Sequence, residues 1–351
     1  MPFDPVESFA SARHEFGEHG GVNMSIEAST TFTVMHARTM PEIFGGHVGP
    51  DAGGCFLYSR HFNPTVYALG HGLAALEGTE SAYPTASGMS AIACALMQLC
   101  SPGDHIVSSN TVYGGTFALM HDYFPARTNI NTTFVDITDL DAVASAITDH
   151  TRSSTPSPSP TPRSTSRHPR ARRPRAPARR RLVVDNTFSP MMLSPAQLGA
   201  DVVVYSLTKF IGGSSDIVAG AICGPARLHR LPHGPPPRVP HAPRPHHGPP
   251  DRLPPLPPPA PPGIRMVEHG RPALAFAEPP RAPRRPVVYP GLPSHPHHHL
   301  LARLANPDYG FGGLFTVDLA TTERAGGSWN FCRTSTGSGT WPSPSGTSTP
   351  S

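Results

Sequence analysis

Lysine is almost absent from this chain: Lys209 is the only one in 351 residues, and every other position in the Lys+Arg total of 28 is arginine. The sequence also has no apolar run of about 18 residues, so we expect no membrane-spanning helix and no membrane partner. Charged residues make up only 15% of the chain and hydrophobic residues 37%, both low for a globular protein. Part of the chain is therefore expected not to fold normally.

Cysteine is also scarce. The five cysteines show no CxxC spacing and an odd count, which is typical of a reduced, intracellular protein. The first 21 residues carry acidic side chains and no apolar core, unlike a signal peptide, so we expect a cytoplasmic protein. The histidine-rich run at 295–299 lacks the carboxylate or cysteine partners of a metal centre, so no metal site is predicted.

Proline and arginine are in excess, and both are concentrated. The chain has 46 prolines, about two and a half times ordinary usage. Of the 32 residues in 231–262, 16 are proline, which excludes helix and interior strand there. Between 151 and 181 there are ten arginines and no acidic residue. The net charge of +4 is therefore local, and no nucleic-acid partner is expected.

Two explanations are open for these segments. They resemble disordered Pro/Arg-rich linkers; alternatively, they are out-of-frame translation. In an adjacent frame, SSTPSPSPTPRS (153–164) can be read as LYAESLSNPTL, and NFCRTSTGSGTWPSPSGTSTPS (330–351) as ELLQNEYGFGYMAVSLGYFDTLM. Both readings restore a sequence pattern that is typical of an α/β protein. The second explanation fits better, and we expect a frame-disrupted chain.

Elsewhere the apolar pattern alternates between strand and helix. Helical spacing is found in TVYALGHGLAALEG (65–78), which ends at a glycine C-cap, and in SGMSAIACALMQLC (87–100). The segments RLVVD (181–185) and ADVVVYS (200–206) are typical of strands. Strands that alternate with helices predict an α/β fold, with a mostly parallel sheet covered by helices on both faces.

Lys209 follows one of these predicted strands, and a lysine amine becomes a nucleophile toward carbonyl groups when it is desolvated. Pyridoxal phosphate (PLP) enzymes need such a lysine, together with a carboxylate, a phosphate cup and a group stacked on the ring. Asp185, which closes RLVVD, is the candidate carboxylate because ligands bind beyond the carboxyl ends of parallel strands. An ordinary Asx-turn in the sequence DNT is the alternative for Asp185.

The phosphate candidate is the start of the helix at ASGMSA, where free backbone N–H groups and the helix dipole favour an anion. Ser87, Gly88 and Met89 form this loop, although a simple Ser N-cap gives the same pattern. Ser206 and Thr208, two residues apart, would share a face if the strand continues to its end. Both could then point at the same phosphate.

The ring-stacking candidate is Tyr113, in the strand-to-helix loop NTVYGG, whose glycines permit close approach. Simple packing of the ring is the alternative. None of these signals is specific alone. Together, on an α/β background, they identify Lys209 as the lysine that forms a Schiff base with PLP.

Several longer motifs resemble the Cys/Met-metabolism family of PLP enzymes and, within it, the γ-lyases that act on methionine. They include YSRHFNPTVYALGHGLAALEG (58–78), ASGMSAI, VYGGT, LVVDNTFSP and LGADVVVYSLTKFIGG (198–213). The resemblance covers about 1–150, 182–224 and, in patches, 263–325. It implies an α/β fold of the PLP-dependent transferase kind (aspartate aminotransferase type I).

The resemblance also implies roles for single residues. The residue at Lys209 forms the internal aldimine, Asp185 holds the pyridinium nitrogen, and Tyr113 stacks on the ring, activates the substrate amine and helps the leaving thiol depart. Tyr58 and Arg60 would reach the phosphate of a neighbouring subunit, which implies a dimer and usually a homotetramer. The phosphate would be held within the chain by residues of two loops: Ser87, Gly88, Met89, Ser206 and Thr208.

The implied division of the chain follows the motifs. An N-terminal arm (1–60) would contact the neighbouring subunit. The PLP-binding large domain would cover 61–230, with a disrupted Arg/Pro/Ser-rich insert at 151–181. A proline-rich disordered stretch (231–262) would precede a remnant of the large-domain end and the C-terminal domain (263–351).

The implied activity is elimination of methanethiol from L-methionine, a sulfur amino acid, with 2-oxobutanoate and ammonia as the other products. Gly115 stands where some methionine-specific lyases carry cysteine, so a cystathionine γ-synthase or O-acylhomoserine sulfhydrylase reaction stays open. An inactive product of a disrupted gene also stays open, because the family's substrate-binding arginine falls in the segment after this sequence ends. A basic, proline-rich interaction protein is the alternative from a different class.

Overall fold

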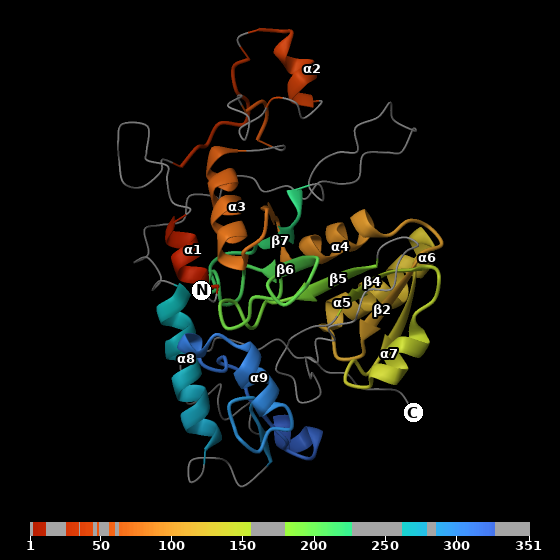
Figure 1. Ribbon diagram of the computed structural model, residues 1–351, viewed down its shortest axis with the longest axis vertical. Coiled ribbons are helices and arrows are strands. Elements are labelled where there is room, and N and C mark those ends of the chain that lie inside the picture. The colour runs from red at the N-terminus through yellow and green to blue at the C-terminus, as the bar shows by residue number, and fades with distance from the viewer. Residues whose placement is uncertain are drawn as a thin grey trace.

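The structure is a computed structural model, and it describes residues 3–11, 26–34, 36–44, 48, 56–59, 63–155, 180–226, 262–278 and 286–326. Within this part of the chain, seven strands form one sheet in the order β1-β7-β6-β5-β4-β2-β3 (Figure 1). Most of the disrupted insert, most of the proline-rich stretch and most of the C-terminal tail lie outside the described residues. None of the described helices is long and apolar enough to cross a membrane.

The elements follow one another along the chain as strands and helices in alternation over most of the sheet. The strands are β1 (Ser81–Thr85), β2 (His105–Ser109), β3 (Asn131–Val135), β4 (Thr151–Thr155), β5 (Arg181–Asp185), β6 (Val202–Ser206), β7 (Gly220–Gly224), β8 (Val287–Val288) and β9 (Thr316–Val317). The α-helices are α1 (Pro5–Ser11), α2 (Thr39–Phe44), α3 (Pro64–Glu77), α4 (Gly88–Leu99), α5 (Gly114–Ala118), α6 (Phe124–Thr128), α7 (Leu140–Ala146), α8 (Pro262–Ala277) and α9 (His298–Leu304). A π-helix, η2 (Leu119–Tyr123), joins α5 to α6, and a 3-10 turn, η4 (Pro307–Tyr309), follows α9.

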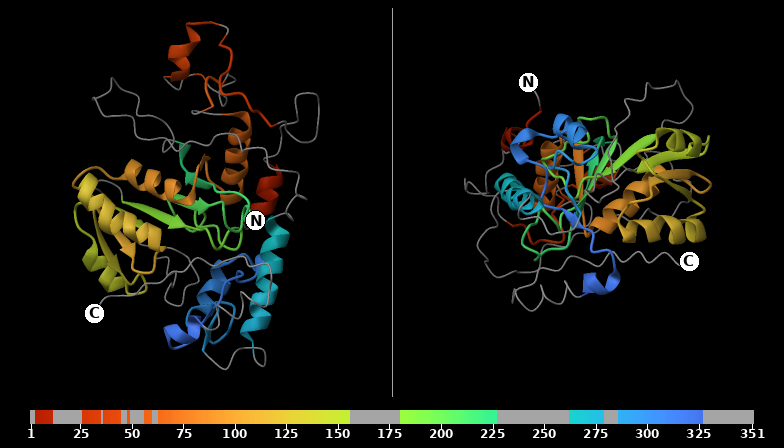
Figure 2. Two further views of the ribbon diagram at one scale, coloured as in Figure 1. Left: turned by 180° about the vertical axis from the view of Figure 1, so that it is seen from behind. Right: turned by 90° about the horizontal axis from the view of Figure 1, so that it is seen from below.

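The sheet is mostly parallel, as the sequence predicts. The pairs β2–β3, β2–β4, β4–β5 and β5–β6 are parallel, whereas β7 runs antiparallel to both β1 and β6. A second, two-stranded sheet joins β8 and β9. The segment 286–326 that contains it packs along α8, on the side of the main sheet away from α4 (Figures 1 and 2).

Strand β6 shows why helices are needed on both faces of the sheet. Its side chains alternate between faces with a period of two residues. Val202 and Val204 are buried in one cluster with residues of α4, whereas Val203 and Tyr205 are buried in another with Leu73 of α3. A strand that is apolar on both faces is the pattern of a buried parallel sheet.

Helix α3 begins and ends where its sequence predicts. The side chain of Asn63 caps the start by accepting from the N–H groups of Thr65 and Val66. Gly78 ends the helix in the left-handed conformation with φ of 69°, which a glycine adopts without the cost of a Cβ. The predicted glycine C-cap is therefore confirmed.

Strand β4 lies within the segment that was expected to be a disrupted insert. The disrupted insert was expected to begin at Thr151, but 151–155 form a strand between β2 and β5, inside the sheet. Arg181, the other expected end of the insert, is the first residue of β5. The sequence TRSST has no apolar periodicity, so its place in the sheet comes from its neighbours, which pair with it on both sides.

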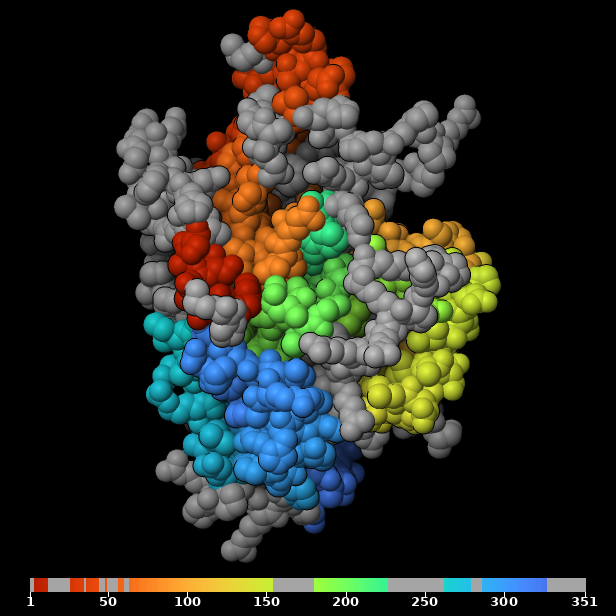
Figure 3. Space-filling model, in the orientation of Figure 1, coloured from red at the N-terminus to blue at the C-terminus, as the bar shows by residue number. Residues whose placement is uncertain are grey.

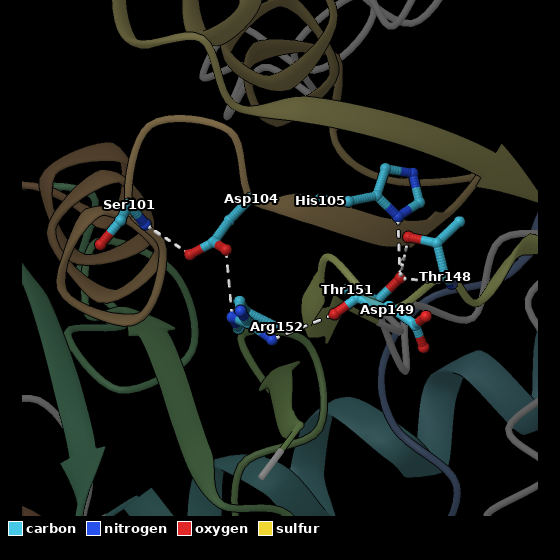
Figure 4. Close-up of polar contacts among 7 residues, drawn as sticks. All are labelled: Ser101, Asp104, His105, Thr148, Asp149, Thr151 and Arg152. Atoms are coloured by element: carbon cyan, nitrogen blue, oxygen red, sulfur yellow. Dashed lines mark hydrogen bonds and ion pairs between the residues drawn. The ribbon is translucent and has the colours of Figure 1, made fainter. Parts of the chain in front are cut away.

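Polar contacts hold the start of β4 against the start of β2 (Figure 4). The Nε atom of Arg152 lies 3.0 Å from Oδ1 of Asp104, and Oδ2 of the same carboxylate accepts from the N–H of Ser101 at 2.8 Å. The Nδ1 atom of His105 lies 2.9 Å from Oγ1 of Thr151. Because these strands are parallel, this network lies at the sheet edge opposite to their carboxyl ends.

A third cluster joins the main sheet to the C-terminal part of the described chain. Met191, Met192 and Leu193, which follow β5, are buried with Met266 of α8 and Leu301 of α9. The space-filling view shows the segment 286–326, in blue, lying along α8, in cyan, beneath the green β5 and β6 region (Figure 3). This packing lies beneath the loops that follow β5 and β6.

Candidate functional site

The carboxyl ends of β5 and β6 bring two of the predicted site segments together. The strands are parallel, with Asp185 in register with Val204. Oγ1 of Thr187 donates to Oδ1 of Asp185 at 2.5 Å and accepts from the N–H of Ser206 at 2.8 Å. Thr187 therefore joins Asp185 to Ser206 directly.

Asp185 forms the Asx-turn that its sequence left open as an alternative. The N–H of Thr187 donates to its Oδ1 at 3.1 Å, which is the Asx-turn. The carboxyl group is also desolvated by burial, which raises its pKa, although the two hydrogen bonds from Thr187 work in the opposite direction. A carboxylate in such a place gains from a cationic partner.

The start of α4 lies against the same strand end. Ser87 is the N-cap of α4, and its Oγ accepts from the N–H of Ser90 at 3.1 Å and lies 2.8 Å from Oγ of Ser90. A Cβ on Gly88 would lie 2.6 Å from Cβ of Ser206 and 2.9 Å from its Oγ. Only glycine allows this approach, so the start of α4 lies directly against Ser206.

Thr208 is placed differently from the expectation. Strand β6 ends at Ser206 and turns from Leu207 onward, so the continuing strand on which a shared face depended is not formed. Oγ1 of Thr208 donates to the carbonyl of Ala219 at 3.2 Å and accepts from the N–H of Ala219 at 3.0 Å. Its hydroxyl proton is therefore used within the chain, between the ends of β6 and β7.

Lys209 lies in the tight turn that follows β6, with its side chain exposed. The turn is closed by the N–H of Lys209, which donates to the carbonyl of Ser206 at 3.2 Å, and by the N–H of Gly213, which donates to the carbonyl of Lys209 at 2.8 Å. Arg265 of α8 donates to the carbonyls of Ile211 and Gly212, at 2.8 Å each. The backbone that carries the amine is therefore held from two sides.

Tyr113 precedes α5 and keeps 56% of its surface exposed. A Cβ on Gly115 would lie 2.7 Å from Cε1 of Tyr113 and 3.2 Å from the sulfur of Met89. The tyrosine ring and the start of α4 therefore meet over Gly115. An exposed aromatic ring next to the α4 terminus can stack on a planar ligand.

One predicted residue of the described chain is not brought into this arrangement. Tyr58 lies on an isolated bridge to Thr31, with 39% of its surface exposed. Arg60 lies outside the described residues. No group of three or more His, Cys, Asp or Glu side chains within the described ranges could hold a metal ion.

Some residues next to the site were not predicted. Thr187, which joins Asp185 to Ser206, could have been found from the Asx motif DNT, whose third residue folds back on the first. A second group is buried behind the strand ends and carries no local sequence signal: Glu77, Asn186 and Tyr205.

The polar edge at the carboxyl ends of a mostly parallel sheet is the place where α/β proteins bind their ligands. The family described as Cys/Met metabolism PLP-dependent enzyme matches residues 9–231. The methionine gamma-lyase of Arabidopsis thaliana is 45% identical over 344 residues, which is 92% of this chain and 73% of that protein. The cystathionine gamma-synthase of Mycobacterium tuberculosis is 38% identical over 317 residues, which is 87% of this chain and 75% of that protein.

A solved structure agrees with these relatives. The cystathionine gamma synthase of Xanthomonas oryzae pv. oryzae, in complex with aminoacrylate and cysteine, is 25% identical, with a TM-score of 0.69. The match covers 94% of this chain and 81% of that one. The chain therefore belongs to the Cys/Met metabolism family of PLP-dependent enzymes, and its cofactor is PLP.

The described residues fit this cofactor on two observations. Desolvation raises the pKa of the half-buried Asp185, and a protonated ring nitrogen is the cation that would stabilise its charged form. Gly88 leaves room that any side chain would fill, at a helix terminus whose N–H groups suit a phosphate. Both lie within the segments joined through Ser206.

Proposed function

We propose that this chain catalyses γ-elimination of L-methionine, in which methionine and water give methanethiol, 2-oxobutanoate and ammonia. The observation that carries the proposal is the meeting of three segments: the turn with Lys209, the strand end with Asp185, and the N-terminus of α4. The identity of 45% with a methionine gamma-lyase over 92% of the chain supports this choice of reaction.

Lys209 would hold the cofactor covalently through its amine, and Asp185 would pair with the ring nitrogen. Tyr113 would stack on the ring from the loop before α5. The phosphate would be held at the start of α4 and at the end of β6, by Ser87, Gly88, Met89, Ser206 and Thr208. Thr208 would have to release its proton from the carbonyl of Ala219 to donate there.

When bound, PLP supplies an electron sink for the carbanions that form next to the substrate nitrogen. Lys209, once displaced by the substrate amine, would take the proton from the α-carbon and return it elsewhere as general base and acid. Tyr113 would accept a proton from the substrate amine and donate one to the sulfur as methanethiol leaves. Asp185 would keep its negative charge beside the ring nitrogen throughout, which maintains the sink.

A second reaction on the same site is favoured by one contact. Gly115 stands where some methionine-specific lyases carry cysteine, and here it is packed against the ring of Tyr113 and the sulfur of Met89. Synthesis of cystathionine from an acyl-homoserine and cysteine, or the corresponding sulfhydrylation, is therefore the alternative. The identity of 38% with a cystathionine gamma-synthase supports it.

We further propose that the active protein is a homodimer or a homotetramer in the cytoplasm. Tyr58 and Arg60 would then complete the phosphate site of a neighbouring subunit, which agrees with the exposure of Tyr58. Two cysteines that the structure describes, Cys100 and Cys223, are buried free thiols, as in a reducing compartment.

The experiment begins with the full chain purified in the presence of PLP. We expect a visible absorbance band that borohydride abolishes, with the pyridoxyl group fixed to the peptide that contains Lys209, and neither in Lys209→Ala. Methionine should then release 2-oxobutanoate and a thiol. Absence of the band in soluble wild-type protein would contradict the cofactor site, and a band without thiol release would contradict the lyase reaction. Formation of cystathionine from an acyl-homoserine and cysteine would instead identify the alternative.

A further inference from the structure

Three polar side chains are buried together directly behind the site. Glu77 is 1% exposed, Tyr205 2% and Asn186 0%. They come from the last residue of α3, from β6 and from the turn after β5. We call these three residues the buried brace.

Hydrogen bonds join the three side chains of the brace to one another and to the backbone. Tyr205 donates its hydroxyl proton to Oε2 of Glu77, while Oε1 of Glu77 accepts from the N–H of Ala196 at 3.1 Å. The side-chain amide of Asn186 donates to the hydroxyl oxygen of Tyr205 at 2.7 Å and to the carbonyl of Leu193 at 3.0 Å. Because each bond fixes the next, the three side chains form one rigid unit.

Two members of the brace are next in sequence to residues of the cofactor site. Asn186 follows Asp185, and Tyr205 precedes Ser206. The backbone N–H of Asn186 donates to the carbonyl of Val204 at 3.0 Å, so the turn after β5 is tied to β6 as well. A change in the brace therefore moves the backbone from which both site residues project.

We propose that the buried brace positions Asp185 and Ser206 for the cofactor and does not serve stability alone. The proposal rests on the proposed PLP site. It assigns Glu77, Tyr205 and Asn186 as positioning residues, since none of them is placed to touch the cofactor itself.

A buried carboxyl group is a poor choice for stability alone. Burial raises the pKa of Glu77 from 4.5 to about 8, despite the hydrogen bonds from Tyr205 and Ala196. Apolar side chains of similar volume can fill such a place without that cost. A polar network, in contrast, fixes the orientation of its side chains as well as the distances between them. Such a network can hold the ends of β5 and β6 at one spacing.

The test compares two tyrosines that are buried to the same degree. Tyr205→Phe removes one hydroxyl from the brace, and Tyr289→Phe removes one far from it in sequence, where Tyr289 is 1% exposed and donates to the carbonyl of Gly312 at 2.8 Å. For the full chain of each variant, three quantities are measured: the Kd for PLP, the pH midpoint of the visible band of the bound cofactor, and the thermal midpoint without PLP.

We expect Tyr205→Phe to weaken PLP binding by about tenfold and to shift the pH midpoint of the band, because Asp185 and Ser206 lose their fixed spacing. Tyr289→Phe should lower the thermal midpoint but leave both cofactor readouts at their wild-type values. Glu77→Leu, which removes both carboxyl oxygens from the brace, should act like Tyr205→Phe; it decides the question if Tyr205→Phe is not soluble.

The inference would be overturned if the brace variants kept the wild-type Kd for PLP and the wild-type pH midpoint of the band. It would also be overturned if Tyr289→Phe, at the same thermal midpoint as Tyr205→Phe, weakened PLP binding equally. Failure of the PLP site itself gives a different result, since the wild-type protein would then bind no PLP at all. The two failures are therefore distinguished by the wild-type titration.

Discussion

At the scale of single residues, Gly115 decides where the ring of Tyr113 can lie. A methyl group there would come within 2.7 Å of Cε1 of Tyr113, whereas one on the neighbouring Gly114 would meet nothing within 4 Å. We predict that Gly115→Ala lowers kcat by about tenfold or more, because the ring must move away from the reacting atoms. Steady-state release of 2-oxobutanoate measures this. Gly114→Ala is the control and should keep wild-type kcat; equal losses in both variants would show that the helix, not the ring, is affected.

Asp185 and Asp201 offer a second comparison between single residues, at opposite ends of the same pair of strands. Oδ1 of Asp201 lies 2.8 Å from a guanidinium nitrogen of Arg181 at the start of β5, whereas Asp185 closes that strand. We predict that Asp185→Asn lowers kcat/KM by at least about a hundredfold, since a neutral amide cannot support the charge of the ring nitrogen. Asp201→Asn should reduce the unfolding free energy without that loss, and a similar kinetic loss in both would contradict the assignment.

At the scale of elements, sequence periodicity predicts helices and strands with apolar faces but misses strands made of polar residues. The helix that ends at Gly78 and strand β6 are predictable, because capping residues and apolar runs are local signals. Strand β4 is not, because TRSST is polar on both faces and is held by the strands on either side of it. Tertiary pairing overrides local preference there.

Strand β4 also carries a group that its neighbours do not satisfy. Ser153 is 0% exposed, and its hydroxyl has no hydrogen-bond partner within the described part of the chain. We predict that Ser153→Ala raises the unfolding free energy by about 1 kcal/mol, because it removes an unsatisfied buried hydroxyl. Urea titration measures the change.

The matched variant lies on the adjacent strand β2. Ser108 is equally buried, but its hydroxyl donates to the carbonyl of Ser109 at 3.2 Å. Ser108→Ala should therefore lower the unfolding free energy. If Ser153→Ala also lowers the unfolding free energy, the hydroxyl of Ser153 has a hydrogen-bond partner after all.

At the scale of the whole molecule, the candidate cofactor-binding residues could be predicted from sequence, whereas the buried brace behind them could not. Lys209 stands out as the single lysine, and Asp185 stands at the end of an apolar run, so both could be found from local sequence. The bond between Glu77 and Tyr205 joins residues 128 positions apart, and no period or motif links them. Such contacts follow from the order of the strands, which local sequence does not specify.

Glu77 also links the whole fold to pH. Its pKa is about 8 in the folded protein against 4.5 in an unfolded chain, so between these values the folded state holds a proton that the unfolded state has lost. The free energy of unfolding therefore falls as pH rises through this window, by up to about 1.4 kcal/mol per pH unit, and levels off above it.

We predict that Glu77→Gln removes this part of the pH dependence, because an amide has no proton to lose. Between pH 5 and 8, the urea midpoint should fall less steeply with rising pH for the variant than for the wild-type protein. Glu80→Gln is the control: Glu80 is exposed just beyond α3, where its carboxylate accepts from the N–H of Ala226 at 3.0 Å. It should keep the wild-type slope, and an unchanged slope in Glu77→Gln would mean that the buried carboxyl group is already ionised in the folded protein.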